Sequence, residues 1–248
     1  MTDNNQAWDE IYSLGQSSRY ANEGDIGIYY RLPKFARMFK KYIPTLNGYR
    51  ILEIGGGVGE MYENLSAEFP NDAFSYTITE YSPNAVDILK EKYNEKGNPV
   101  VAQANAEHLQ FEDNSFDVVC AFDVLHHVPD PLRMAQEMLR VSRQHIFLCE
   151  PCGISLIRKI TEITVTGKQL GEKSYSPRQI RKFFTSPTSN NRVVTMITPF
   201  YFFVPPKIKK QFMYPFIIIS EIGQRIPLLR WQSQSVAIYI DIKNLKGE

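Results

Sequence analysis

The segment at positions 51–60, Ile-Leu-Glu-Ile-Gly-Gly-Gly-Val-Gly-Glu, constrains the fold more than any other part of this chain. An apolar run typical of a buried strand contains Glu53, and Gly55, Gly57 and Gly59 follow at alternate positions before a predicted helix. Glycine has no Cβ, so such a run lets the backbone turn sharply and approach a ligand closely. The free N–H groups at the start of the next helix add donors for polar ligand atoms. The pattern predicts a strand–turn–helix unit of an α/β protein with a ligand beside the turn; a tight turn without a ligand is the alternative.

The acids around the glycines indicate which kind of ligand to expect. A dinucleotide-binding turn carries a third glycine where this chain has Glu60, and a carboxylate at that position repels a diphosphate. Glu53 can instead pair with a cationic group. These two acids favour a ligand with an amino-acid end and disfavour a nicotinamide-dependent dehydrogenase.

A second strand is predicted at positions 74–79, because aromatic and β-branched residues dominate it. It ends at Glu80, about twenty residues past the glycines, where doubly wound sheets bind the hydroxyls of a ribose. Glu80 and its neighbour Tyr81 are therefore candidates for cofactor binding. The alternative for Glu80 is a solvated strand end.

A third motif occupies positions 105–117, Asn-Ala-Glu-His-Leu-Gln-Phe-Glu-Asp-Asn-Ser-Phe-Asp. With the glycine turn and Glu80, it resembles the Rossmann-like, or class I, S-adenosylmethionine-dependent methyltransferases, in particular the small-molecule type 11 group. The family patterns read acid-x-Gly-x-Gly-x-Gly and Asp-Ala-Glu-x-Leu-Pro-Phe-x-Asp-x-Ser-Phe-Asp, so Asn105 and Gln110 depart from them. The resemblance covers positions 50–130 with the motifs in the family's order.

This resemblance implies a cofactor and its contacts. S-adenosyl-L-methionine would be the cofactor and S-adenosyl-L-homocysteine the product, with the glycine turn under the methionine part. The family residue at the Asn105 position hydrogen-bonds the adenine amino group, and an amide carbonyl accepts that bond as well as a carboxylate does. The resemblance also implies a backbone N–H from Ala106 to the adenine ring, and Glu107 belongs to the same set of cofactor-binding candidates.

The resemblance further implies the fold. We expect an α/β, doubly wound sheet in the strand order 3-2-1-4-5-7-6, with strand 7 antiparallel, helices on both faces and a helical cap. Segments with the character of the later strands lie at 118–122, 145–149, 192–198 and 235–242.

One methyltransferase domain is expected over the whole chain, because its 43% apolar content supports a single sizeable core. Near the N-terminus, Leu32, Phe35 and Phe39 lie on one face of a predicted helix, whereas basic residues, among them Arg31 and Lys34, dominate the other face. The aromatic residues upstream, Tyr12 among them, either face the pocket or pack in the core. The expected parts are an N-terminal helical cap at 1–48, a cofactor-binding half at 49–150 and a substrate and cap half at 151–248.

The loop at positions 123–130, Asp-Val-Leu-His-His-Val-Pro-Asp, carries the catalytic candidates. Ligands of open α/β sheets bind beyond the carboxyl ends of the strands, and this loop follows the fourth strand. We choose His127, and then His126, as the general base, because an unperturbed imidazole titrates near neutrality; a capping or packing role is the alternative. Asp123 and Glu150 are expected to line the pocket. No set of carboxylates forms a recognisable metal site.

Charge is divided unevenly along the chain. The net charge is +1, but positions 50–130 carry 15 acids and 4 bases, a balance of −11, whereas positions 131–248 carry 18 bases and 7 acids, a balance of +11. This asymmetry favours an anionic acceptor or partner at the second half. Two solvated sides of one domain are the alternative.

The segment at positions 200–231 interleaves five bases and one acid with large apolar residues. One interpretation is that this segment contacts an anionic membrane or covers a lipid-linked acceptor. The alternative is a cap packed on the sheet or a homodimer interface. The chain carries no recognised nucleic-acid-binding motif. Monomer and homodimer both remain open.

We therefore predict a methyltransferase that acts on a hydroxyl, amine or carbon of a small-molecule acceptor, which is free or linked to a lipid or glycan. The alternative is a catalytically silent S-adenosylmethionine-binding regulator or scaffold. Three cysteines without a disulfide pattern favour a cytoplasmic location. Membrane association is left open by positions 200–231.

Overall fold

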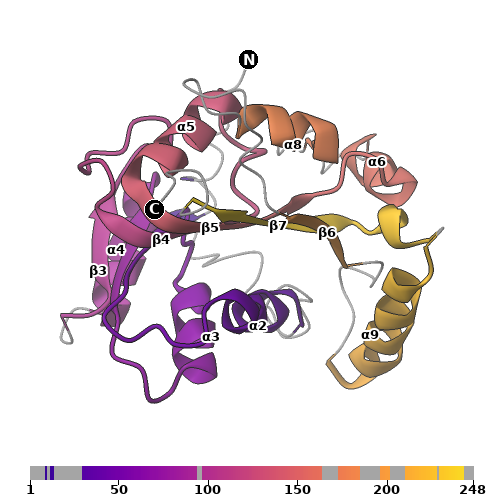
Figure 1. Ribbon diagram of the computed structural model, residues 1–248, viewed down its shortest axis with the longest axis horizontal. Coiled ribbons are helices and arrows are strands. Elements are labelled where there is room, and N and C mark those ends of the chain that lie inside the picture. The colour runs from indigo at the N-terminus through magenta and orange to yellow at the C-terminus, as the bar shows by residue number, and fades with distance from the viewer. Residues whose placement is uncertain are drawn as a thin grey trace.

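The chain folds around one mixed β-sheet with helices on both faces (Figure 1). The computed structural model describes residues 9, 12, 13, 30–93, 97–163, 173–184, 196–201, 210–227 and 229–242. Most of the predicted N-terminal cap and positions 192–195 of a predicted strand lie outside these residues.

The described strands form a seven-stranded sheet in the order β3-β2-β1-β4-β5-β7-β6. The pairs from β3 to β5 are parallel, whereas β7 is antiparallel to both β5 and β6, so the predicted order and the direction of the seventh strand are confirmed. The strands are β1 (Arg50–Ile54), β2 (Ser75–Glu80), β3 (Val100–Gln103), β4 (Phe116–Phe122), β5 (Ser142–Pro151), β6 (Met196–Tyr201) and β7 (Ser235–Asp241).

The helices form two layers. Figure 1 shows α2, α3 and α9 on one side of the sheet and α5, α6 and α8 on the other; Leu89 and Tyr93 of α4 pack in the same apolar cluster as α2 and α3. The bounds are α2 (Leu32–Tyr42), α3 (Glu60–Glu68), α4 (Pro83–Tyr93), α5 (Pro131–Val141), α6 (Leu156–Ile163), α8 (Pro177–Phe183), α9 (Lys210–Arg225) and the 3₁₀ helix η2 (Arg230–Gln232).

Local sequence signals explain where two helices begin. Asp130 caps α5 by accepting a hydrogen bond from the Arg133 N–H, and a proline occupies the first helical turn. Ser176 and Gln179 form a reciprocal capping box at the start of α8. Side-chain acceptors thus satisfy N–H groups that have no partner within the helix.

The core lies on both faces of the central strands, which are buried along almost their whole length. This is the pattern that parallel strands covered by two helical layers require. On the α2 side, the rings of Phe39 and Phe147 stack with centroids 4.0 Å apart, and Phe35 meets Phe122 edge to face at 5.4 Å. These contacts attach α2 to the centre of the sheet beside the end of β4.

The connection between β6 and β7 begins and ends at one edge of the sheet. Tyr201, at the end of β6, pairs with Ser235, at the start of β7, and Ser235 also pairs with Pro151 at the end of β5. Positions 200–231, for which the sequence left several structures open, contain the 16-residue helix α9; residues 202–209 lie outside the described part. Within the described residues, every helix falls short of the length and apolarity needed to cross a membrane.

Candidate functional site

A pocket opens at the carboxyl ends of β1, β2 and β4. Its position agrees with the rule that open α/β sheets bind ligands beyond the carboxyl ends of their strands. The wall combines the three predicted motifs with the loop after β4, which meet here from distant parts of the sequence. The lining residues include Tyr12, Gly55, Gly57, Glu60, Glu80, Tyr81, Asn105, Ala106, Glu107, Phe122, Asp123, Val124 and His127.

The glycine turn forms the floor of this pocket. Gly55 and Gly57 have φ values of +67° and +57°, a left-handed conformation that side chains disfavour. A Cβ on Gly55 would lie 2.5 Å from a Val124 methyl, so the turn and the loop after β4 pack too closely for any side chain there. Gly59 has a different role, because it begins α3 with φ of +86°, packs against Tyr93 and is not among the residues that line the pocket.

Glu80 joins the glycine turn to the end of β2. One carboxylate oxygen accepts a hydrogen bond from the Gly57 N–H at 3.0 Å, and the other accepts one from the Tyr81 N–H at 2.7 Å. Burial raises the pKa of the Glu80 carboxyl, although these backbone donors favour its charged form. A carboxylate at the wall of the pocket suits a pair of ribose hydroxyls, and Tyr81 is exposed beside it.

Glu53 does not line the pocket, so its position does not support the predicted direct pairing with a cationic ligand. Its side chain is 3% exposed, and one carboxylate oxygen accepts a hydrogen bond from the Tyr76 hydroxyl at 3.0 Å. Burial raises the pKa of Glu53 to about 8, the Tyr76 hydroxyl opposes this shift, and the carboxylates of Glu60 and Glu80 add to it. The carboxyl therefore lies beneath the glycine turn as a buried polar group.

Asn105, Ala106 and Glu107 line another part of the pocket wall. The Asn105 side-chain oxygen accepts a hydrogen bond from the Glu107 N–H at 2.9 Å, which leaves its second lone pair for the predicted bond to adenine. The Glu107 carboxylate accepts a hydrogen bond from the Asp130 N–H at 2.6 Å. The third motif is thus connected to the start of α5.

Glu150 holds the loop after β4 in place. One of its oxygens accepts hydrogen bonds from the N–H groups of Val124 and Leu125 at 3.1 and 2.9 Å, and the other lies 2.8 Å from His126 Nδ1. Glu150 and His126 are buried and neither lines the pocket, which corrects the expectation that Glu150 lines it. His127 is the histidine of this loop that lines the pocket.

Arg31 connects the N-terminal helix to the pocket, a contact that the sequence did not reveal. The guanidinium lies 2.8 Å from an Asp123 carboxylate oxygen and 4.7 Å from the centre of the Phe122 ring, and both side chains of the ion pair are 11% exposed. Arg31 is therefore largely buried against the end of β4. Asp123 has φ of +57°, which turns the chain sharply at the end of β4.

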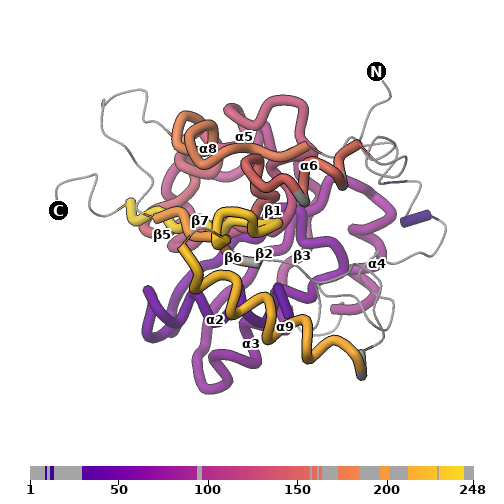
Figure 2. The backbone as a smooth tube through the Cα atoms, turned by 90° about the vertical axis from the view of Figure 1, so that its right-hand side faces the viewer, coloured from indigo at the N-terminus to yellow at the C-terminus, as the bar shows by residue number. Residues whose placement is uncertain are grey.

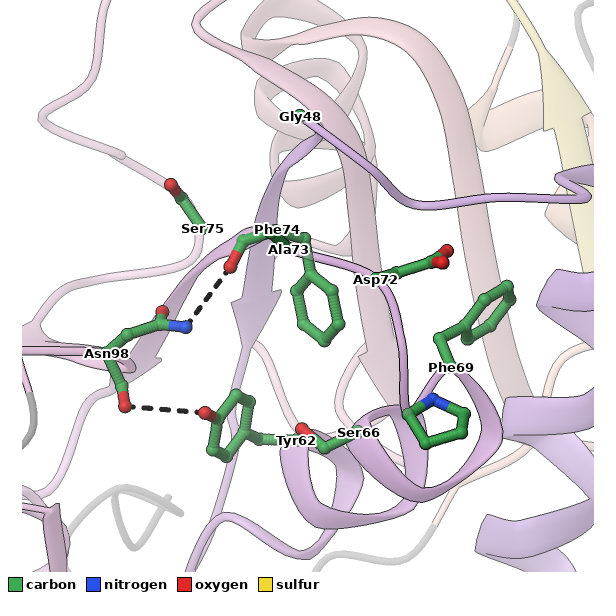
Figure 3. A pocket seen from close by; sticks show the side chains of 10 residues that line it. Gly48, Tyr62, Ser66, Phe69, Asp72, Ala73, Phe74, Ser75 and Asn98 are labelled. Carbon is green, nitrogen blue, oxygen red and sulfur yellow. Dashed lines mark hydrogen bonds between the residues drawn. The ribbon is translucent and has the colours of Figure 1, made fainter.

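A second cavity, of about 410 Å³, lies at the amino end of β2 and is lined by Tyr62, Phe69, Phe74 and Asn98 among others (Figure 3). The Tyr62 hydroxyl donates a hydrogen bond to the Asn98 carbonyl at 3.3 Å, and the Asn98 amide donates one to the Phe74 carbonyl at 3.1 Å. None of the predicted site residues lines this cavity. We therefore place the functional site at the carboxyl edge.

The pocket suits a ligand with a ribose and a cationic amino-acid end. The glycine turn forms its floor, and four acidic residues (Glu60, Glu80, Glu107 and Asp123) line its wall together with the small side chain of Ala106. A Cβ on Gly57 would lie 3.5 Å from the Tyr12 hydroxyl, which lines the same pocket, so a side chain there would enter the ligand space. The fold and the position of the pocket are those expected of a Rossmann-like methyltransferase.

Comparison with known proteins agrees with this class. Residues 52–148 match the family described as "Methyltransferase domain". The ubiquinone/menaquinone biosynthesis C-methyltransferase of Shewanella sediminis is 32% identical over 112 residues, 42% of this chain and 44% of that protein. The phosphatidylethanolamine N-methyltransferase of Cereibacter sphaeroides is 35% identical over 100 residues, 39% of this chain and 47% of that protein. The chain thus spans less than half the length of these relatives.

A solved structure shows the same fold over nearly the whole chain. The structure of a Haloferax volcanii putative methyltransferase in complex with the Trm112 activator superposes with a TM-score of 0.64 at 13% identity, covering 94% of this chain and 96% of that one. Residues 52–148 of this chain are thus similar to the methyltransferase domain of the Rossmann-like, class I S-adenosylmethionine-dependent methyltransferases of the small-molecule type. S-adenosylmethionine is the cofactor of that family.

Proposed function

We propose that this protein transfers the methyl group of S-adenosylmethionine to a hydroxyl, amine or carbon of a small acceptor with an apolar, lipid-linked part. The observation that carries the proposal is the shared pocket: His127 lines the same cavity as the glycine turn and Glu80. A proton acceptor and a cofactor cradle therefore face one space. The curated relatives named above include a quinone-pathway C-methyltransferase and a phospholipid N-methyltransferase, which supports an acceptor with an apolar part.

In this proposal the bound cofactor supplies an activated methyl group, so the protein needs to align the acceptor and remove its proton. Glu80 binds the ribose hydroxyls, Asn105 and Ala106 meet the adenine, and the turn from Gly55 to Gly57 meets the amino-acid end. Asp123 orients that end or the acceptor, with its carboxylate held by Arg31.

His127 acts as the general base toward the acceptor. The buried Glu150 carboxylate fixes the backbone of Val124 and Leu125 and the ring of His126, so the loop that carries His127 is held rigidly. The ring centroids of His126 and His127 lie 3.9 Å apart, and this packing further restricts the position of the base. His126 is thus a positioning residue in this proposal.

The acceptor class is tested by supplying S-adenosylmethionine with a labelled methyl group to a cell extract and separating organic from aqueous phases. We expect label in the organic phase. Label in the aqueous phase alone would contradict the lipid-linked acceptor. Tight S-adenosylhomocysteine binding without turnover on any extract would instead favour a regulator or scaffold.

The role of His127 is tested by the substitution His127→Gln. We expect kcat to fall by a factor of about 10² to 10⁴, the usual contribution of a general base, while cofactor affinity measured by calorimetry stays unchanged. His108→Gln is the matched control, because His108 is exposed and does not line the pocket. Equal activity of both variants would refute the role of His127.

A further inference from the structure

The outward face of α9 is apolar. Tyr214 is 71% exposed, and Ile218 and Ile222 follow it at intervals of four residues with about half of their surface exposed. Phe212 and Ile219 are also exposed on this helix, whereas Met213 and Ser220 face inward. Residues four apart lie on one side of a helix, so these side chains form a continuous stripe toward solvent.

A second apolar stripe lies on α6. Leu156, Ile160 and Ile163, spaced by four and three residues, are 70%, 63% and 68% exposed. Figure 1 shows α6 and α9 on opposite sides of the sheet at its β6 end, and Figure 2 shows both from that end. Two exposed apolar helices at one end of a molecule exceed the scattered apolar residues of an ordinary surface.

Two exposed basic side chains lie at the C-terminal end of α9. Arg225 ends the helix and Arg230 follows in η2, and both are exposed. The acid of α9, Glu221, accepts a hydrogen bond from Lys34 Nζ at 2.7 Å and another from the Tyr30 hydroxyl. The face that α9 offers to a partner thus combines apolar side chains with positive charge.

These contacts also place α9 beside the pocket. Tyr30 and Lys34, which bind Glu221, flank Arg31, whose guanidinium lies 2.8 Å from Asp123 in the pocket wall. On the other side of the sheet, α6 begins five residues after the end of β5, at the carboxyl edge. A surface that contacts both helices would therefore lie next to the pocket.

We propose that the exposed faces of α6 and α9 dock the protein on the surface of an anionic lipid bilayer, with the pocket facing that surface. Basic residues beside an apolar helical face are the pattern that binds the interface of membranes with acidic lipids. A second copy of the chain fits less well, because a two-fold interface would bring Arg225 and Arg230 close to their own copies. This inference rests on the proposed function, since it explains how a lipid-linked acceptor reaches the pocket.

The test is co-sedimentation of the full chain with vesicles of phosphatidylglycerol and phosphatidylcholine, and with vesicles of phosphatidylcholine alone. We expect binding to the anionic vesicles that weakens with added salt. The double substitution Ile218→Glu with Ile222→Glu should weaken it at least about tenfold, because two exposed apolar contacts become charges of the wrong sign. Leu132→Glu, an exposed leucine at the start of α5, is the matched control and should bind like the native chain.

Three results would overturn the docking surface: no binding to anionic vesicles at low salt, equal binding by the double variant, or self-association that the double substitution abolishes. The labelled-methyl assay, run beside the vesicle assay, separates this inference from the proposed function. A chain that binds vesicles without methylating any acceptor would contradict the function alone. A chain that methylates a lipid-extractable acceptor without binding vesicles would contradict the docking surface alone.

Discussion

The Glu53 carboxyl is buried beneath the glycine turn, and its contribution to the free energy of unfolding can be measured. Its carboxyl is 3% exposed and its pKa is raised to about 8 from the ordinary 4.5, with burial as the main cause. The substitution Glu53→Gln keeps the size of the side chain and an oxygen that accepts the Tyr76 hydrogen bond. The amide also resembles the protonated acid, so it removes the cost of a buried charge.

The sign and size follow from the two pKa values. Because the folded-state pKa lies above the unfolded one, the stabilising contribution of Glu53 is fully present below the unfolded pKa of 4.5 and is lost as pH rises through about 8. With 1.36 kcal/mol for each pKa unit, the loss between about pH 5 and about pH 8 is on the order of 3 to 4 kcal/mol. The glutamine variant lacks this dependence.

The assay is urea denaturation of both proteins at a series of pH values, with the difference in unfolding free energy taken at each. We expect the free energy of unfolding of Glu53→Gln to increase relative to that of the native chain as pH rises from about 5 to about 8. Affinity for S-adenosylmethionine should stay within about twofold at low pH, because Glu53 does not line the pocket. Parallel pH curves would refute the buried, protonated carboxyl, and an affinity loss of about a hundredfold would restore the direct charge pairing predicted from the sequence.

Two further substitutions test the cofactor site. Glu80→Ala should weaken S-adenosylmethionine binding by about 1–3 kcal/mol in calorimetry, since charge-assisted hydrogen bonds to the ribose are lost; a negligible change would exclude Glu80 as the ribose ligand. Gly57→Val should abolish that binding while circular dichroism still shows a folded chain, because the residue has φ of +57° and its side chain would enter the pocket toward Tyr12. Unchanged affinity of this variant would contradict the placement of the methionine end over the turn.

The resemblance to a known family predicted the order of the sheet, whereas apolar runs and helix start signals located the strands along the chain. Strand ends were less predictable. The fifth strand, expected at 145–149, extends from Ser142 to Pro151, since its polar residues find buried partners on other elements. Gln144, for example, donates a hydrogen bond to Asp117 at 2.8 Å, and Glu150 binds the loop after β4. Such partners come from distant positions and leave no periodic signal.

The site likewise contains residues whose position could be predicted from the sequence and residues whose position could not. Gly55, Gly57 and His127 were placed in the pocket by their position at strand ends, where backbone direction decides what a residue faces. Glu53 lies within β1, where successive side chains point to opposite faces, so one position decides between pocket and core. The Arg31–Asp123 ion pair joins residues 92 positions apart, and composition gives no indication of which basic residue of a helix turns inward.

The pairing of Tyr201 with Ser235 determines which part of this fold can vary most easily between related proteins. Because β6 ends and β7 begins at the same edge of the sheet, the chain leaves the sheet and returns to it at neighbouring positions. We therefore expect a change in the length of the α9 segment to leave the strand order β3-β2-β1-β4-β5-β7-β6 intact. The outer face of α9 can therefore vary while the strands that carry the pocket stay the same.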